Sequence, residues 1–589
     1  MKYFNFKIII YLLAATLTIG CNKSDSENFD YTPEEEPVKI VQIELKTDKA
    51  AYVPGEQVVF SAAQFSGSVS VKYKYLNTVI AQQPLSGSSW EWSSPSDDFK
   101  GYMVELYQMV DGKEVVVGSV AVDVSSDWTK FPRYGFLSKF DAISDSQINQ
   151  VVDNLKDYHI NGLQYYDWHN KHHFPLKMNG DSPASNWLDI AKRETSFSTV
   201  EKYITASKGK NIASMSYNLL YGAWEDFASD GVSREWMLFN DSNHQNINKH
   251  DLDANWALSD ILVLNPANTL WQDYIFKKTQ SIYDHLDFDG WHLDQLGNRG
   301  TVYDYDGKIV ALDNAFGPFL GNLKQAFPNK KMVLNAVNQY GQSQILNEAV
   351  DFAYTEVWQG NEGFDDLATI IKRNNTLSNN SKNTVLAAYM NYDLANNTGV
   401  FNTPGVLLTD AVIFAFGGAH LELGEHMLGK EYFPNNNLAI NNELKNSFSS
   451  YYNFLVAYQN LLRDGGTFNN PMLISGDGKV NLNNWPPISS KVSVIGKEFS
   501  DKQVIHLINF SEANNLNWRD LNGEQQTPKI KKDFILNLSS SKNVTKVWYA
   551  SPDLNLGSSV ELDFSQNGNN LIFKIPSLQY WGMIVVEYS

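Results

Sequence analysis

Three patterns of apolar and polar residues follow one another along the chain. Residues 38–124 hold short alternating apolar runs broken by Gly, Ser and Pro, which predict strands at 38–41, 57–60, 69–73 and 115–117. From about Trp128, strand patterns alternate with helical ones. From about Pro471, strand patterns continue without helices, at 492–495, 504–508, 534–538, 547–549 and 583–586. The chain is therefore predicted to contain a β domain, a mixed α/β domain and a second β domain.

The middle segment holds eight strand candidates with helical patterns between them. We expect the strands at 134–140, 162–168, 212–219, 290–296, 332–337, 352–358, 385–392 and 419–423. A capping box of Ser144 and Gln147 begins a helix whose apolar residues lie at i, i+3, i+4 and i+7: Ile148, Val151, Val152 and Leu155. A last helix has one apolar stripe, made of Leu444, Phe448, Tyr451, Leu455, Tyr458 and Leu462. Eight such alternations predict a (β/α)8 barrel, that is, a TIM barrel. A doubly wound sheet is the alternative, but no Gly-rich phosphate-binding fingerprint follows an early strand.

These patterns place the domain boundaries. We expect a signal peptide at 1–21, a flexible tether at 22–37, an immunoglobulin-like β-sandwich at 38–126, the barrel at 127–468 and an antiparallel β-sandwich at 469–589. A chain of this length exceeds what one hydrophobic core usually serves, which agrees with a multidomain organisation.

The first residues predict export. An apolar run from Ile8 to Ile19, too short to span a bilayer, leads to Cys21, the only cysteine of the chain. This resembles a bacterial lipoprotein signal with Cys21 as the lipidated residue, although Thr18 stands where that motif usually has Leu. The residues after this cysteine, at 22–37, are polar and acidic. In many Gram-negative glycan degraders, a similar acidic stretch after the lipidated cysteine accompanies display on the cell surface. We therefore expect a lipid anchor in the outer membrane, at the cell surface.

Composition and charge narrow the class of ligand. The formal net charge of −19 argues against nucleic acid, whose phosphates need a basic face. The chain has 15 Trp, 30 Tyr and 32 Phe, which suits sugar binding but also a large β-rich core. We expect a monomer that acts on a neutral substrate without a cofactor.

Acidic residues stand near the ends of four predicted strands, where a barrel of this type carries its reacting groups. They are Asp167, Asp294, Glu356 and Glu422, and the first three have a tryptophan close by. Paired carboxylates with aromatic residues suit glycoside hydrolysis, in which one acid attacks the anomeric carbon and a protonated one assists the leaving oxygen. An isolated Asp at a strand end more often caps a helix or bonds a loop, and Asp289 is interpreted in this way.

Two other chemistries fit the sequence less well. His169, His172 and His173 stand close together, but no Glu or Cys completes a familiar zinc spacing, so we expect no metal site. The run from Gly341 to Ile345 approaches the nucleophile elbow of serine hydrolases but lacks its second glycine.

Five segments together resemble glycoside hydrolase family 66. Residues 132–138 and 158–168 are similar to its opening strands, 289–294 to its nucleophile strand, 354–358 to its acid/base strand, and 420–428 to its eighth strand. The resemblance covers the whole predicted barrel, and the two β domains match the three-part architecture of the family.

The resemblance implies endo-acting, retaining cleavage of the α-1,6 linkages of dextran to isomaltooligosaccharides. Asp294 would be the nucleophile, Glu356 the general acid/base, and Asp167 a third acid that binds sugar hydroxyls. Further contacts to the substrate are expected from Trp168, Tyr217, Trp358, Asn391, Glu422 and His426.

Two alternatives remain open. The family also holds cyclising isomaltooligosaccharide glucanotransferases, which typically carry an extra carbohydrate-binding module inserted in the barrel. The longest predicted connection, from Tyr221 to Asp289, leaves no room for such a module, which favours the hydrolase. The second alternative is not an enzyme but a surface lipoprotein that binds glycans. Such a protein is expected to be a string of β-sandwiches without a barrel, so the eight predicted strands speak against it.

Overall fold

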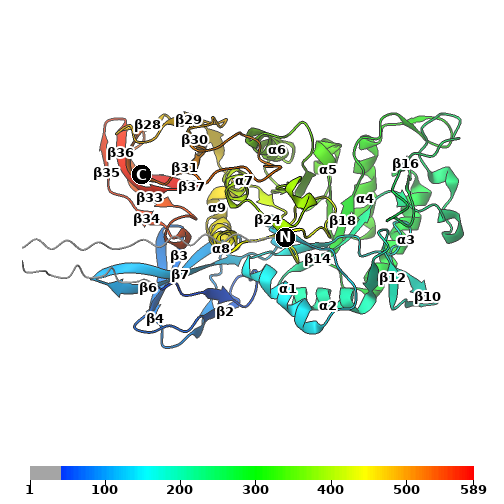
Figure 1. The fold of residues 1–589 in the computed structure, drawn as a ribbon, viewed down its shortest axis with the longest axis horizontal. Coiled ribbons are helices and arrows are strands. Elements are labelled where there is room, and N and C mark those ends of the chain that lie inside the picture. The colour runs from blue at the N-terminus through cyan, green and yellow to red at the C-terminus, as the bar shows by residue number, and fades with distance from the viewer. Residues whose placement is uncertain (1–40) are drawn as a thin grey trace, which may run out of the picture. The chain divides into compact units, whose positions relative to one another are not determined.

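The computed structural model describes residues 41–589 (Figure 1). The predicted signal peptide, Cys21 and the tether lie outside these residues. In residues 41–589, no helix has both the length and the apolar character needed to cross a membrane.

Two antiparallel sheets form at the start of the described chain, and the strand predictions at 57–60, 69–73 and 115–117 are confirmed. The sheets have the orders β1-β2-β5 and β4-β3-β6-β7. Their strands are β1 (Leu45–Thr47), β2 (Gln57–Ala62), β3 (Ser70–Tyr75), β4 (Thr78–Pro84), β5 (Ser89–Ser93), β6 (Lys100–Val110) and β7 (Lys113–Val124). Alternate residues point into one apolar core, in which Val58 and Phe60 of β2 meet Val71 and Tyr73 of β3. Of the run predicted at 38–41 only Val41 is described, and it is not in a strand.

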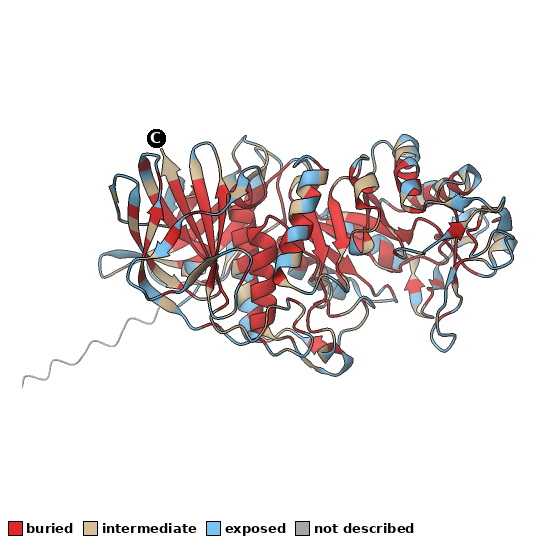
Figure 2. Cartoon of the chain, turned by 90° about the horizontal axis from the view of Figure 1, so that it is seen from above, coloured by how far each residue is buried: buried red, intermediate tan, exposed pale blue. Residues whose placement is uncertain are grey.

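The eight strands predicted in the middle segment are all present and parallel. They are β8 (Tyr134–Leu137), β9 (Gly162–Tyr165), β14 (Ala213–Leu219), β18 (Gly290–Asp294), β21 (Lys331–Leu334), β22 (Ala353–Glu356), β23 (Thr384–Ala387) and β25 (Ala419–His420). Most end before the predicted residue, because the polar residues that follow leave the ladder and enter loops. Every residue of β8, β9 and β23 is buried, as parallel strands covered on both faces require, and Figure 2 shows these central strands as buried.

These strands form two sheets that are joined at both edges. The sheets have the orders β8-β9-β14-β18-β21 and β22-β23-β25. A parallel bridge between Asn335 and Tyr354 connects β21 to β22. At the other edge, the Phe136 N–H donates to the Leu423 carbonyl over 3.1 Å. The carboxyl ends of all eight strands therefore meet at one side.

Helices follow the strands along the chain. They are α1 (Asp145–Asp157), α2 (Phe197–Lys208), α3 (Thr269–His285), α4 (Phe316–Ala326), α5 (Gln342–Leu346), α6 (Phe364–Leu377), α7 (Thr403–Ala415), α8 (Asn442–Ala457) and α9 (Gln459–Leu462). The capping box of Ser144 and Gln147 that was predicted to begin α1 is present. The predicted apolar stripe of the last helix is buried throughout, although that helix is divided into α8 and α9 at Tyr458.

The loops carry short strands and turns of their own. Small sheets pair β10 (Met178–Asn179) with β11 (Ser182–Pro183), β12 (Asn186–Leu188) with β13 (Glu194–Ser196), β19 (Val302–Tyr303) with β20 (Ile309–Val310), and β24 (Gly399–Val400) with β26 (Leu438–Ala439). A three-stranded sheet joins β15 (Gly222–Ala223), β17 (Ile261–Val263) and β16 (Lys249–His250). This last sheet extends the loop after β14 over the carboxyl ends of the strands.

The C-terminal region contains two further sheets around a separate apolar core. Its strands are β27 (Thr467–Asn469), β28 (Leu473–Ser475), β29 (Leu482–Asn484), β30 (Val492–Glu498), β31 (Lys502–Asn509), β32 (Lys531–Ser539), β33 (Val544–Ala550), β34 (Val560–Glu561), β35 (Phe564–Asn567), β36 (Asn570–Leu578) and β37 (Trp581–Tyr588). The orders are β27-β30-β31-β37-β33-β34, with β29 beside β30, and β28-β32-β36-β35. Leu507, Leu536 and Ile584 are fully buried in the core of this region. All five strand predictions after Pro471 are confirmed.

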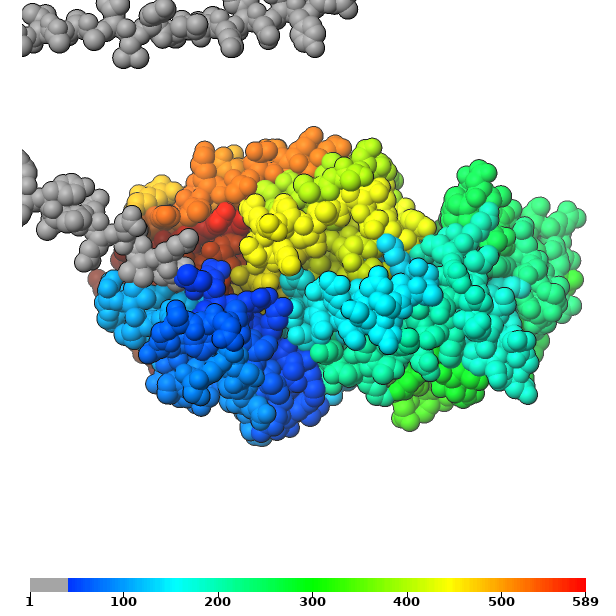
Figure 3. Space-filling view, turned by 60° about the horizontal axis from the view of Figure 1, so that its bottom comes forward, coloured from blue at the N-terminus to red at the C-terminus, as the bar shows by residue number. Residues whose placement is uncertain are grey.

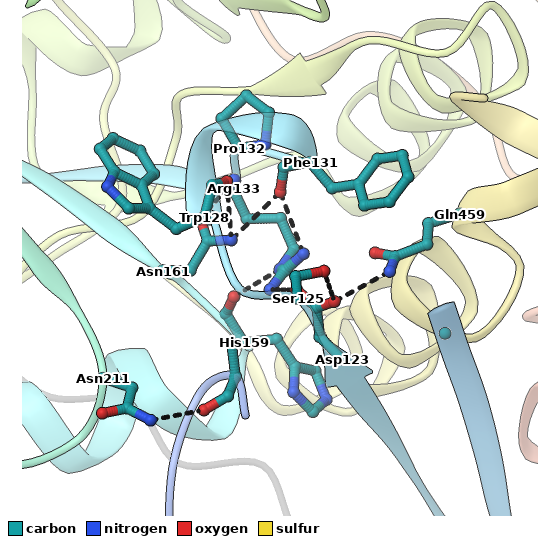
Figure 4. A network of polar contacts seen from close by, with 12 residues as sticks. Asp123, Ser125, Trp128, Phe131, Pro132, Arg133, His159, Asn161, Asn211 and Gln459 are labelled. Atoms are coloured by element: carbon teal, nitrogen blue, oxygen red, sulfur yellow. Dashed lines mark hydrogen bonds and ion pairs between the residues drawn. The ribbon is translucent and has the colours of Figure 1, made fainter. Parts of the chain in front are cut away.

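A buried polar network ties the first β region to the centre of the chain (Figure 4). Arg133, just before β8, donates to Asp123 of β7 over 2.8 Å, and neither side chain is accessible to solvent. The other oxygen of Asp123 accepts hydrogen bonds from Ser125 (2.6 Å) and from Gln459 of α9 (2.8 Å). Figure 3 shows the blue N-terminal part of the chain beside yellow residues, and α8 contacts both β6 and β7. Asp123 therefore connects the end of β7 both to the nearby start of β8 and to α9, which is far away in the sequence.

Candidate active site

Three acidic residues stand at the carboxyl ends of strands and line one cavity. Asp294 is the last residue of β18, Glu356 is the last residue of β22, and Asp167 lies two residues beyond β9. The cavity has a volume of about 760 Å³, and all three side chains line it. Because parallel strands end at the same side, acids that are far apart in the sequence meet there.

Asp294 accepts three hydrogen bonds. The Tyr217 hydroxyl donates to Oδ2 over 2.6 Å, while the Asn335 amide and the Gln295 backbone N–H each donate to Oδ1 over 2.8 Å. Burial raises the pKa of Asp294, and these three donors oppose that rise because they stabilise the carboxylate. The carboxyl group is thus desolvated and held in one orientation by its three donors.

Glu356 has a different environment. The Tyr389 hydroxyl donates to its Oε1, and the Asn335 amide donates to its Oε2 over 3.3 Å. Burial, followed by the nearby charge of Asp294, raises the pKa of Glu356 to about 7. A carboxyl group with this pKa is protonated in much of the protein near neutral pH, as a general acid must be.

Asn335 connects the two acids. Its Nδ2 donates to both Asp294 and Glu356, and its Oδ1 accepts the backbone N–H of Glu356 over 3.2 Å. Asn335 follows β21 directly, as Tyr389 follows β23 closely. Neither Asn335 nor Tyr389 was predicted from the sequence, in which each is an uncharged residue just after an apolar run. A search for any polar residue at these positions would have found them.

Asp167 is the third acid of the cavity and is almost fully buried. Its backbone adopts a left-handed φ of 52°. Burial raises the pKa of Asp167 to about 7, although the charge of Arg193 opposes this. Next to it, Tyr166 stacks on Phe433 with ring centroids 4.3 Å apart. A buried carboxyl group beside an aromatic wall suits the binding of sugar hydroxyls.

Two of the weaker predictions for substrate contacts line the cavity, namely Tyr217 and Trp358. Trp358 lies 5.4 Å from Tyr389, between ring centroids. The two rings form part of the wall beside Glu356.

Four predicted contacts do not line the cavity: Trp168, Asn391, Glu422 and His426. Trp168 is fully buried in the apolar core, 5.1 Å from Phe288 between ring centroids. It neighbours Asp167 in the turn that follows β9, where the left-handed backbone of Asp167 turns the chain, and the two side chains end on different sides.

The side chains of the other three residues form hydrogen bonds within the protein. Asn391 is fully buried and donates to the Asp520 carbonyl over 2.7 Å. Glu422 is fully buried and accepts from the Tyr452 hydroxyl over 2.9 Å. The Nε2 of His426 is 2.7 Å from the Phe433 carbonyl. Polar residues near the end of a strand hold the fold together in these cases.

Within residues 41–589, two groups of His and acidic side chains have the spacing of metal ligands. In the first, made of His173, Asp226 and Asp230, the ligand atoms lie within 4.8 Å of one another. Lys171 forms ion pairs with both of these aspartates, so a lysine already occupies part of the space where an ion would bind. The second, made of Asp410, His420 and Glu422, is fully buried below the cavity.

Comparison with known proteins identifies one matching family, two relatives and one solved structure described below. The profile of glycosyl hydrolase family 66 matches residues 47–585. A cycloisomaltooligosaccharide glucanotransferase of Niallia circulans is 28% identical over 92% of this chain and 71% of its own length. A dextranase of Streptococcus salivarius is 23% identical over 83% of this chain and 67% of its own length. The crystal structure of a Paenibacillus sp. cycloisomaltooligosaccharide glucanotransferase complexed with cycloisomaltoheptaose superposes with a TM-score of 0.85 at 25% identity, over 92% of this chain and 99% of that one.

Proposed function

The chain belongs to glycosyl hydrolase family 66, and we propose that it is an endo-acting, retaining dextranase that hydrolyses α-1,6-glucosidic linkages. One observation carries the proposal: a single amide nitrogen, Nδ2 of Asn335, donates to both Asp294 and Glu356 at the end of one cavity. The two carboxyl groups are therefore close enough to act on one glucosyl unit.

The spacing of the acids supports retention. Inverting glycosidases separate their carboxyl groups by roughly 6.5–9.5 Å to admit a water molecule, and retaining enzymes by about 5–5.5 Å. The oxygens of Asp294 and Glu356 that accept from Asn335 lie 2.8 and 3.3 Å from its nitrogen. The nearest oxygens of the two acids therefore share one donor, which fits the shorter separation of retaining enzymes better than a gap that admits a water molecule.

The proposed reaction has two steps. In the first, an Asp294 oxygen bonds to the anomeric carbon, the bond from that carbon to O6 of the next glucose breaks, and O6 takes the proton of Glu356. In the second, a water oxygen attacks the same carbon, gives its proton to Glu356 and releases Asp294. Each acid returns to its initial state, and the linkage is hydrolysed with retention.

The environments of the two acids support this division of roles. Asp294 has three donors that stabilise its anion, as a nucleophile needs. Glu356 has its pKa raised to about 7, as a proton donor near neutral pH needs. The donors around Asp294 thus favour its anion, whereas burial and the charge of Asp294 favour the protonated form of Glu356.

Azide rescue tests the roles separately, with a linear α-1,6-glucose oligomer that carries fluoride as its leaving group. In Asp294→Ala, azide would take the place of the nucleophile and give a β-glycosyl azide. In Glu356→Ala, azide would attack the glycosyl-enzyme and give an α-glycosyl azide. The same anomer from both variants, or no loss of dextran cleavage in Asp294→Ala, would overturn the assignment.

The second candidate is a cyclising glucanotransferase, which the names of two relatives favour. The alignment with the Niallia circulans enzyme is 711 positions long, whereas this chain has 589 residues, so that enzyme has aligned segments that this chain lacks. Cyclising members are expected to carry an extra module, and a chain without the corresponding segments is therefore better suited to hydrolysis. Dextran digestion followed over time decides between them: linear oligomers support the dextranase, and dominant cyclic products would replace it with the transferase. A non-catalytic glycan-binding protein would release neither linear nor cyclic products.

The proposed domain architecture and cellular location of the protein follow from the same family membership and from the predicted lipoprotein signal. We propose that the eight strands close into a (β/α)8 barrel over residues 127–468, between β-sandwiches at 38–126 and 469–589. We further propose a monomer, held on the outer membrane by a lipid on Cys21. Replacing Cys21 by Ser is expected to release the protein from membranes, and retention of the variant in the membrane fraction would refute the anchor.

A further inference from the structure

The cavity that holds the acids also has an apolar floor. Five of its lining residues belong to one cluster together with Trp224: Ile190, Leu219, Leu252, Ile261 and Leu296. Leu219 lies opposite Asp294 in the register of β14 and β18, so the floor begins beside that acid. From there it continues under the small sheet of β15, β16 and β17.

A tryptophan stands at the edge of this floor. Trp256 lines the cavity, and 44% of its surface is accessible to solvent. Its loop is held by the hydrogen bond from the Trp256 N–H to the Asp253 carbonyl, 3.0 Å. A large ring that stays exposed within a cavity offers an apolar face to a ligand.

His172 supplies a polar group to the same cavity, and its protonation is fixed by a neighbour. The indole Nε1–H of Trp224, which can only donate, points to Nδ1 of His172 over 3.3 Å. Nδ1 must therefore be the unprotonated acceptor, and Nε2 carries the hydrogen. Burial lowers the pKa of His172 well below its usual value, so the ring stays neutral.

The remaining nitrogen of this ring has no partner within the described protein. Among residues 41–589 Nε2 of His172 has no hydrogen-bond partner, yet it is not sealed from solvent, and the residue lines the cavity. Gly222 packs against the ring so closely that a Cβ there would lie 2.7 Å from Cδ2 of His172. The imidazole is therefore held in place, and its Nε2–H is available to a ligand in the cavity.

We propose that the apolar floor, Trp256 and His172 form a subsite for a glucosyl unit of the substrate beyond the cleavage point. The inference rests on the proposed function. The C–H face of the sugar ring stacks on Trp256, and Nε2–H of His172 donates to one of its hydroxyl oxygens. An apolar floor, an aromatic face and a single neutral donor suit an uncharged sugar, whereas a charged ligand would need an opposite charge.

Chain-length kinetics test the stacking residue. We would measure kcat and KM on linear α-1,6-glucose oligomers of increasing length for the wild type, Trp256→Ala and the control Leu258→Ala. Leu258 is similarly exposed and close in the sequence but does not line the cavity. For Trp256→Ala, KM is expected to rise about tenfold on long oligomers and not on the shortest ones, with kcat nearly unchanged. A KM ratio that does not depend on length, or an equal effect in Leu258→Ala, would overturn the subsite.

Two measurements test His172. His172→Ala is expected to raise KM about fivefold to tenfold, whereas His172→Gln, which keeps an N–H donor, recovers part of the loss. Nitrogen NMR of histidine-labelled protein, assigned with the Gln variant, should show a protonated Nε2 and an unprotonated Nδ1 at neutral pH. A hydrogen on Nδ1, or no difference between the Ala and Gln variants, would contradict the proposed donor.

Binding separates this inference from the function on which it rests. Calorimetry with the same oligomers compares Asp294→Ala with Asp294→Ala/Trp256→Ala. If the wild type cleaves dextran and both variants bind long oligomers equally, the subsite fails and the dextranase stands. If the wild type does not cleave dextran but the second substitution weakens binding, the subsite stands and the proposed function fails.

Discussion

The Tyr389 hydroxyl donates a hydrogen bond to Oε1 of Glu356. This bond lowers the pKa of Glu356, against burial and the charge of Asp294, which raise it. Tyr389→Phe removes the donor, so the Glu356 pKa should rise further and the acid should keep its proton to higher pH. We expect the basic limb of the kcat/KM profile to move to higher pH in this variant. The profile is measured on dextran from pH 4 to 9.

A nearby tyrosine provides the control for this prediction. Tyr392 donates to Glu431 and does not line the cavity, so Tyr392→Phe should leave the basic limb in place. A basic limb that stays in place in Tyr389→Phe would mean that another group controls it.

Asn335 is expected to be needed by both acids. Its amide lowers the pKa of Asp294 and of Glu356, so Asn335→Ala should raise both. The acidic limb of the pH profile should then move to higher pH, and kcat/KM should fall about 10²-fold, as when one positioned donor is removed from a catalytic site. Asn314→Ala, which removes an amide near the protein surface, is the control. If kcat/KM in Asn335→Ala stays within twofold of the wild type, the shared amide has no catalytic role.

The sequence indicated the acids of this site better than their partners. Asp294 and Glu356 stand where apolar strand patterns end, and parallel strands bring such ends together, so local patterns were enough. Trp168 is one residue from Asp167, but it faces the core, and a sequence pattern does not reveal which of two adjacent residues leaves the strand first. Glu422 also ends a strand pattern, yet its partner Tyr452 comes from α8. Contacts of that kind depend on packing between distant segments.

Glu356 should also make folding stability depend on pH. Its pKa in the folded chain is about 7, above its ordinary value of 4.5. Between these values the folded state binds more protons than the unfolded state, so the contribution of this group to stability falls as the pH rises. Gln cannot ionise, and we expect Glu356→Gln to be more stable than the wild type by about 1–3 kcal/mol at pH 8, with the difference vanishing near pH 4. Urea unfolding across this range measures it.

A surface glutamate controls for the loss of one charge. Glu201 on α2 is exposed, and Glu201→Gln should change the free energy of unfolding little at any pH. If the advantage of Glu356→Gln is the same at pH 4 and pH 8, ionisation of this carboxyl group does not cause it.

The ion pair of Arg133 and Asp123 is expected to hold the first β region to the centre of the chain. Both side chains are fully buried, and the aspartate also accepts from Gln459 of α9 (Figure 4). Removing one partner leaves the other charge buried and unpaired, so Arg133→Met and Asp123→Leu should each destabilise the protein by about 3–5 kcal/mol. The double variant leaves no unpaired charge and should lose less than the two single variants together. Denaturant unfolding of the wild type and the three variants gives the four free energies of this double-mutant cycle. Strictly additive losses of unfolding free energy would show that the two residues act independently.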